Sequence, residues 1–220
     1  MEKKANLKEM STKQRIGYIW DYYKWHMIGT VLAVSVAASI LHHFITYREP
    51  LLNIIMINGG NNAVSEENNG FNEFLSAYGY DPSESPIACS SFYFPENDTA
   101  VSSAYLEQQA LIAIIAAGEQ DIFLGNGAVY ENYCRQGALV DLSTILSPQL
   151  LSSYEDSLIY ADTGENAPYP CAIELSENPW LSQYGYTGTC RFGILTSFQN
   201  EEACKEFAEF LRSEEHTSEL

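Results

Sequence analysis

Basic residues are scarce in this sequence. The 220 residues contain 11 Lys and Arg against 29 Asp and Glu, which gives a formal net charge of −18. Proteins that bind nucleic acid neutralise phosphates with Lys and Arg, and a strongly acidic surface repels phosphates. The composition therefore excludes nucleic acid as an expected partner.

Histidine is also sparse, and none of the four His residues lies between positions 44 and 215. That range lacks a GxSxG elbow, a P-loop and a GxGxxG turn after a strand. A cysteine nucleophile would have no histidine to activate it. Carboxylate pairs such as Glu66/Glu67 and Asp162/Glu165 lie in loops rich in Asn and Gly, where solvated surface charge is usual. We expect no catalytic residue, no metal and no cofactor.

One long apolar block, MIGTVLAVSVAASILHHFITY, covers residues 27–47. At about 1.5 Å per residue, a helix of this length crosses a hydrocarbon core of roughly 30 Å. We therefore predict a transmembrane helix over 27–47. A cleaved signal peptide is the alternative, because the uninterrupted apolar run ends at Leu41 and two His follow it. Aromatic residues mark both edges of the block, as interfacial belts do: Trp20, Tyr22, Tyr23, Trp25, Phe44 and Tyr47.

The charges around this block predict its orientation. Lys and Arg accumulate on the cytoplasmic side of a membrane, and the chain after residue 47 is strongly acidic. Residues 1–26 are thus expected to form a basic cytoplasmic segment, with residues 48–211 in an extracytoplasmic domain. We expect a single-pass protein of the cell membrane. The basic residues before the block are Lys3, Lys4, Lys8, Lys13, Arg15 and Lys24.

The predicted ectodomain begins with alternating strands and helices. Apolar runs at 51–58, 87–94 and 121–125 predict strands, and helical spacing predicts helices at 71–78 and 99–118. This β-α-β-α-β order favours an α/β fold with a mostly parallel sheet, covered by helices in three layers.

The later part of the ectodomain is less regular. We predict a helix at 129–136, a strand at 190–198 and a helix at 201–211, and leave 150–160 and 170–175 open between helix and strand. The ectodomain also holds all five cysteines, without CxxC or metal-ligand spacing. We interpret them as small buried apolar side chains, with one disulfide as the alternative. They are Cys89, Cys134, Cys171, Cys190 and Cys204.

Two segments resemble type 2 extracellular solute-binding proteins. Residues 115–146, IAAGEQDIFLGNGAVYENYCRQGALVDLSTIL, are similar to a family segment in which a helix ends in "aaG", a strand carries "pDvf" and a "G.l.pLd" turn follows. Residues 192–211 are similar to the returning hinge strand and its "eeA..Fl" helix. The resemblance implies two α/β lobes around a small ligand. Because the stretch between Gly125 and Cys190 is too short for a second lobe, we expect one lobe of this periplasmic-binding-protein-like type 2 fold. The alternative is a truncated relative whose natural chain continues after Leu211 into a second lobe.

A ligand in a parallel α/β sheet binds where the strands end, near helix N-termini. Asn amides and bare glycine backbone there suit a neutral polar solute such as a sugar or a peptide. The alternative is that Asn and Gly only form tight turns. The candidate ligand-binding residues are Asn58, Gly59, Gly60, Asp98, Thr99, Asn126 and Gly127.

These observations predict a membrane-anchored, non-catalytic domain that binds a small polar ligand or a membrane-protein partner. The alternative is a scaffold component of a membrane complex without ligand binding, and a hydrolase is the third choice. Residues 212–220, RSEEHTSEL, resemble the in-frame translation of a sequencing-adapter oligonucleotide. We expect them to be an artefactual tail after Leu211, with a solvated polar tail without structure as the alternative.

Overall fold

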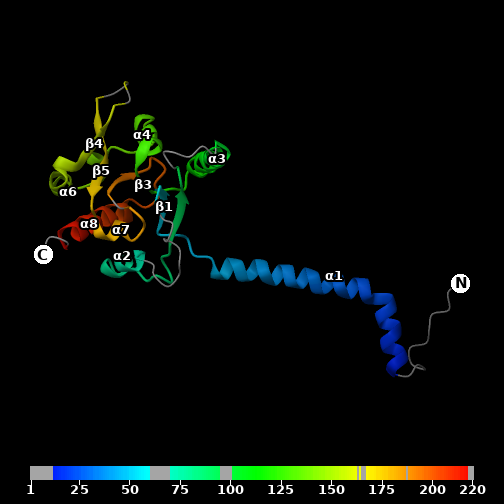
Figure 1. Cartoon of the computed structure of the whole chain (residues 1–220). Coiled ribbons are helices and arrows are strands. Elements are labelled where there is room, and N and C mark those ends of the chain that lie inside the picture. Colours follow the sequence, from blue (N-terminus) through cyan, green and yellow to red (C-terminus); the bar gives the residue numbers. More distant parts are fainter. Residues whose placement is uncertain are drawn as a thin grey trace. The chain divides into compact units, whose positions relative to one another are not determined.

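The computed structural model describes residues 12–59, 70–94, 101–162, 164, 167–186 and 188–217. The chain divides into two units, Met1–Tyr47 and Arg48–Leu220 (Figure 1).

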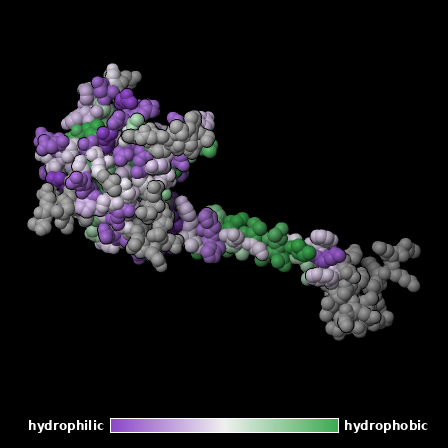
Figure 2. All heavy atoms as spheres, in the orientation of Figure 1, coloured by the Kyte–Doolittle hydropathy of each residue, from purple (hydrophilic) through white to green (hydrophobic). Residues whose placement is uncertain are grey.

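The first unit contains one long helix, α1 (Thr12–Thr46). Its residues Tyr23–Thr46 are long and apolar enough to cross a membrane, and their most apolar stretch is not buried against other parts of the chain. Figure 2 shows the apolar side chains along this helix. The predicted apolar helix is therefore present and ends at Thr46, one residue before its expected end. Its length and composition are compatible with a membrane anchor or a signal sequence.

The second unit contains one six-stranded sheet with the order β2-β1-β3-β6-β5-β4. β1 pairs in parallel with β2 and β3, whereas the β3–β6, β6–β5 and β5–β4 pairs are antiparallel. The strands are β1 (Leu52–Ile57), β2 (Ile87–Phe92), β3 (Ile122–Gly125), β4 (Leu158–Ala161), β5 (Tyr169–Ser176) and β6 (Thr189–Ile194).

The prediction of a mostly parallel sheet is thus wrong for the sheet as a whole. It holds for β1, β2 and β3, whose connections include the crossover helices that a parallel arrangement needs. The connection 162–168 between β4 and β5 is too short for a crossover. The connection 177–188 between β5 and β6 contains a four-residue helix and is also too short for a crossover. The chain therefore reverses direction after β4 and again after β5, and these strands pair antiparallel.

Helices cover both faces of the sheet. Figure 1 shows α3 and α4 on one side and α2, α7 and α8 on the other. The helices are α2 (Phe71–Ala77), α3 (Val101–Ala117), α4 (Gly127–Arg135), α5 (Leu142–Ile145), α6 (Pro148–Ser153), α7 (Pro179–Ser182) and α8 (Glu201–Thr217), with a 3₁₀ turn at Glu155–Ser157.

The alternation of side chains along β1 produces two hydrophobic cores. Leu52, Ile54 and Met56 pack with residues of α2, α7 and α8. Ile55 and Ile57 point to the opposite face and pack with residues of α3 and α4. Both faces of the strand are buried, which explains its continuous apolar run. The three-layer arrangement predicted from the sequence is present.

The segment after β5, which the sequence left without a clear pattern, fills the first core. The Trp180 ring packs against Phe71, Phe207 and Phe210, with ring centroids 5.2 to 5.6 Å apart. The Trp180 indole N–H donates a hydrogen bond to the Gly70 carbonyl at 3.1 Å. α7 therefore joins α2 and α8 on one face of the sheet.

α8 does not end at Leu211. The helix continues through Arg212 to Thr217, past its predicted end at residue 211, so the alternative of a polar tail without structure is wrong for these residues. The Arg212 guanidinium lies 5.2 Å from the centre of the Tyr154 ring.

Candidate functional site

Two of the candidate side chains meet at the carboxyl ends of the parallel strands. Asn58 follows β1 and Asn126 follows β3, and the Asn58 side-chain amide donates a hydrogen bond to the Asn126 side-chain oxygen at 3.3 Å. Because neighbouring parallel strands end at the same edge of a sheet, the sequence prediction places these residues correctly.

Both amides also bind the backbone around them. The Asn58 side-chain oxygen accepts the N–H of Phe94 at 2.6 Å. The Asn126 amide nitrogen donates to the Thr189 carbonyl at 3.4 Å. Asn58 has a φ of 58°, a left-handed conformation that asparagine tolerates better than most residues. These contacts favour a structural role for the pair, in closing the turns after β1 and β3.

Tyr186 covers the same edge of the sheet. Its ring lies over Gly59, so close that a β-carbon on residue 59 would stand 2.3 Å from the ring. Its hydroxyl donates a hydrogen bond to the Ile57 carbonyl at 3.1 Å, with the Leu124 carbonyl 3.4 Å away. Tyr186 is buried and therefore occupies space beside Gly59 that a solute would need.

The remaining candidate residues are Gly127, which the structure describes, and three residues that it does not describe. Gly127 is the first residue of α4 and has a φ of 80°. Gly60, Asp98 and Thr99 lie outside the described residues.

An ion cluster that the sequence analysis missed lies near this edge. Arg191 contacts the Glu131 carboxylate at 3.0 Å and the Glu174 carboxylate at 3.3 Å. These contacts link β6 to α4 and to β5. Because Glu174 and Arg191 are opposite each other in the β5–β6 pair, the alternation of both strands could have indicated the contact.

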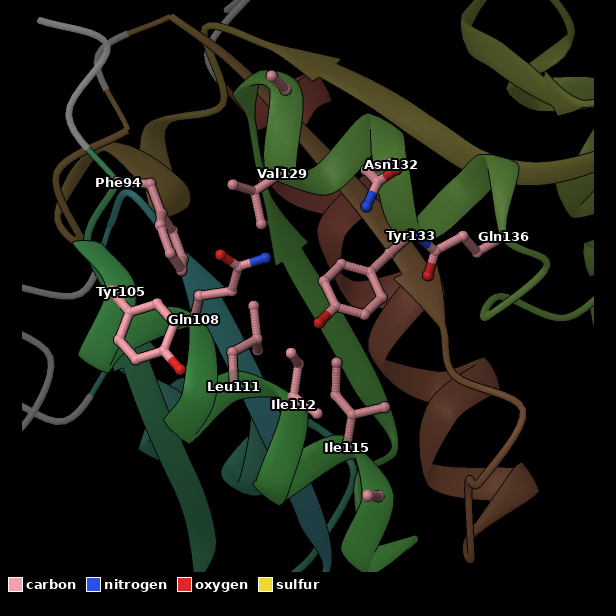
Figure 3. Close-up of a pocket in the computed structure, with 12 residues that line it drawn as sticks. Phe94, Tyr105, Gln108, Leu111, Ile112, Ile115, Val129, Asn132, Tyr133 and Gln136 are labelled. Carbon is pink, nitrogen blue, oxygen red and sulfur yellow. The ribbon is translucent and has the colours of Figure 1, made fainter. Parts of the chain in front are cut away.

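A groove with a volume of about 830 Å³ lies between α3 and α4. Figure 3 shows Gln108 and Leu111 of α3 pointing toward α4. None of its described lining residues is charged. They are Phe94, Tyr105, Gln108, Leu111, Ile112, Ile115, Ala116, Ala128, Val129, Asn132, Tyr133 and Gln136.

α3 exposes an unusual amount of apolar surface beside this groove. Leu111 is buried, but Tyr105, Leu106 and Ile112 are 59%, 68% and 45% exposed. A helix that is apolar on all sides is normally buried, so the exposure of these side chains is unusual. The sequence carried the signal, since between residues 105 and 117 only Glu107 is charged.

Across the described ranges, no three His, Cys, Asp or Glu side chains gather as a metal site requires. The groove offers amide and phenol groups on an apolar surface, which suit binding.

Comparison of the chain with family models, curated proteins and solved structures finds no match.

Proposed function

We propose that this chain is a single-pass membrane protein whose extracytoplasmic domain binds an envelope protein partner without catalysis. The observation that carries the proposal is the uncharged groove between α3 and α4, bordered by exposed apolar side chains of α3. Monomeric proteins rarely leave such a helix uncovered. The long apolar helix α1 and the basic residues before it support the membrane anchor and its orientation.

The partner that best fits the groove is an apolar helix flanked by Lys and Arg. Grooves between two helices commonly bind an amphipathic helix through its apolar face. The net charge of −18 favours basic flanks on the partner and disfavours a second copy of this chain. The partner helix would place its apolar side chains against Tyr105, Ile112 and Val129.

A small polar solute at the strand edge has less support. The Asn58 and Asn126 side chains already bind each other and the backbone, and Tyr186 covers Gly59. Binding a solute there would break these contacts before forming new ones.

Photo-crosslinking tests the proposal. A photoreactive amino acid replaces Gln108, which lines the groove, in the full chain in its native membrane. The matched control replaces Ser152, an exposed residue of α6 on the other face of the sheet. We expect a defined adduct from the Gln108 position only, and mass spectrometry should locate the crosslink in an apolar helix with basic flanks.

Two substitutions on α3 provide the second comparison. Ile112→Asp places a charge in the groove, whereas Ala113→Asp places the same charge on an exposed neighbour that does not line it. We expect at least a tenfold loss of the adduct with Ile112→Asp and little loss with Ala113→Asp. Equal labelling from Gln108 and Ser152 would contradict the proposal. An adduct of twice the mass of the chain would show that the groove binds a second copy instead.

A further inference from the structure

Two buried cysteines on different elements of the domain face each other. Cys134 lies in the last turn of α4 and Cys171 lies on β5, and both belong to the core between the sheet and α3 and α4. A hydrogen bond between the two thiols is the largest cause of the shift in the pKa of each. All five cysteines are reduced in this structure.

The packing of α4 explains why the two thiols meet. Tyr130 and Cys134 are four residues apart, so they lie on the same face of α4. The Tyr130 hydroxyl and the Cys171 carbonyl both lie within 3.2 Å of where a β-carbon on Gly193 would stand. The absence of a side chain at Gly193 lets Tyr130 approach the sheet there. One turn further along α4, Cys134 lies in the same buried core as Cys171.

We infer that Cys134 and Cys171 form a disulfide that ties α4 to β5. The inference goes beyond partner binding, and it uses the proposed extracytoplasmic location only as the source of an oxidant. The oxidant belongs to the class of disulfides, either a small molecule such as oxidised glutathione or a thiol–disulfide oxidoreductase.

The chemistry of the pair is suited to thiol–disulfide exchange. The hydrogen bond from Cys134 lowers the pKa of the Cys171 thiol, and burial opposes this effect. The nearby charge of Arg191 also favours the Cys171 thiolate. In the folded domain, Cys171 is therefore the thiol of the pair that more readily forms the thiolate, which is the attacking species.

The exchange balances in two steps. The Cys171 thiolate attacks one sulfur of the oxidant, whose other sulfur leaves as a thiolate and takes up a proton. The Cys134 thiol then loses its proton and attacks the Cys171 sulfur, which releases the second half of the oxidant as a thiol. Two S–H groups of the chain become one S–S bond, and the oxidant is reduced to two thiols. Because both thiols are buried, we expect the reaction to occur before α4 closes over β5 during folding.

The disulfide would fix one wall of the groove. Asn132, Tyr133 and Gln136 line the groove from the turn of α4 that carries Cys134. A covalent bond at Cys134 would hold this turn against the sheet, so the groove would keep its shape when no partner is bound.

Peptide mapping of the full chain in detergent tests the inference. The purified protein is refolded in a glutathione redox buffer at an extracytoplasmic poise, its free thiols are alkylated, and it is cleaved after Lys, Arg and Glu. This cleavage leaves each of the five cysteines in a separate peptide. We expect peptide 132–135 to be crosslinked to peptide 166–174, with alkylation of the other three: Cys89, Cys190 and Cys204. Alkylation of both Cys134 and Cys171, or a crosslink between other cysteines, would overturn the inference.

Thermal unfolding provides an independent measurement. A disulfide that closes the long segment 134–171 should raise Tm by about 10 °C over the reduced protein. Reductant should remove this difference in the wild type and in Cys204→Ala, but should have no effect in Cys134→Ala. The peptide map of the wild type decides the question even if Cys134→Ala fails to fold. A failed crosslink from Gln108 would count against the groove and leave the disulfide unaffected.

Discussion

The Asp121 carboxylate accepts the backbone N–H of Gln199 at 2.6 Å. Its other oxygen accepts the N–H of Asn53 at 2.8 Å, and the side chain is buried. One carboxylate thus joins the start of β3 to β1 and to the turn before α8. Asp121 also stands where the resembling segment matches the aspartate of the "pDvf" pattern, and its contacts account for an aspartate there on structural grounds alone.

Replacement of Asp121 should destabilise the domain. The carboxamide of an asparagine would keep one acceptor oxygen, but its NH₂ group would face the backbone N–H of Asn53 or of Gln199. Because two donors cannot bond to each other, at least one hydrogen bond to a charged acceptor is lost. We expect Asp121→Asn to lower the free energy of unfolding by about 2–4 kcal/mol. Urea titration of the full chain in detergent measures this change. Asp156→Asn, at an exposed position, is the control and should change it by less than about 0.5 kcal/mol.

Gly59 should not tolerate a side chain. Gly59→Ala would force a methyl group against the Tyr186 ring, which is held by its hydrogen bond to Ile57. We expect a loss of about 1–3 kcal/mol in unfolding free energy. Gly188→Ala is the matched control, because nothing lies within 4 Å of a β-carbon there. In the double variant Gly59→Ala/Tyr186→Ala, the cost should be smaller than the sum of the two single costs; strict additivity would argue against the contact.

The parallel half of the sheet could be predicted from sequence with good accuracy. β1, β2 and β3 are apolar runs bounded by Gly, Asn or Pro, and their observed ends lie close to the expected ones. The antiparallel half could not be predicted as well. β4 is short, and β5 carries a mixed pattern of apolar and polar residues. The place of β5 depends on pairing with β6, which comes later in the chain, and the place of β4 depends on pairing with β5.

The candidate site, like the sheet, could be predicted from the sequence only in part. The proximity of Asn58 and Asn126 could be predicted from the sequence because two adjacent parallel strands end beside them. The ring over Gly59 belongs to Tyr186, far along the chain, and no local pattern connects the two. The groove depends on how α3 and α4 lie on the sheet, although the apolar composition of α3 was visible.

The left-handed backbone of Asn58 gives a prediction that separates conformation from hydrogen bonding. Asn58→Ala loses the bonds to Phe94 and Asn126 and retains a strained φ, so we expect a cost of about 2–3 kcal/mol. Asn58→Gly loses the same bonds without the strain and should cost less. Asn126→Ala, where the backbone is extended, should cost about 0.5–1.5 kcal/mol. Urea titration of the three variants measures the order; equal costs for Ala and Gly at position 58 would rule out backbone strain.

Stability should depend on pH above about 10 through Tyr80. Partial burial and the hydrogen bond that its hydroxyl donates to Glu206 at 2.6 Å raise the pKa of Tyr80 to about 12. An unfolded tyrosine has a pKa of about 10. The stabilisation is therefore fully present below about pH 10 and is lost as the pH rises to about 12.

This dependence can be measured by comparing wild type with Tyr80→Phe. The difference in unfolding free energy between them should shrink between about pH 9 and about pH 12. Glu206→Gln removes the carboxylate, so Tyr80 should then titrate closer to its ordinary pKa. A difference between wild type and Tyr80→Phe that stays constant over this range would contradict the assignment.

The position of β3 has a consequence for biosynthesis. β3 (residues 122–125) lies between β1, which is made before it, and β6 (residues 189–194), which is made long after it. A chain that emerges from the ribosome in order can assemble β2, β1 and β3, but one edge of β3 then has no strand to pair with. We expect this open intermediate to persist until residue 194 has emerged, which makes it the stage at which a chaperone or a neighbouring nascent chain can most readily bind the domain.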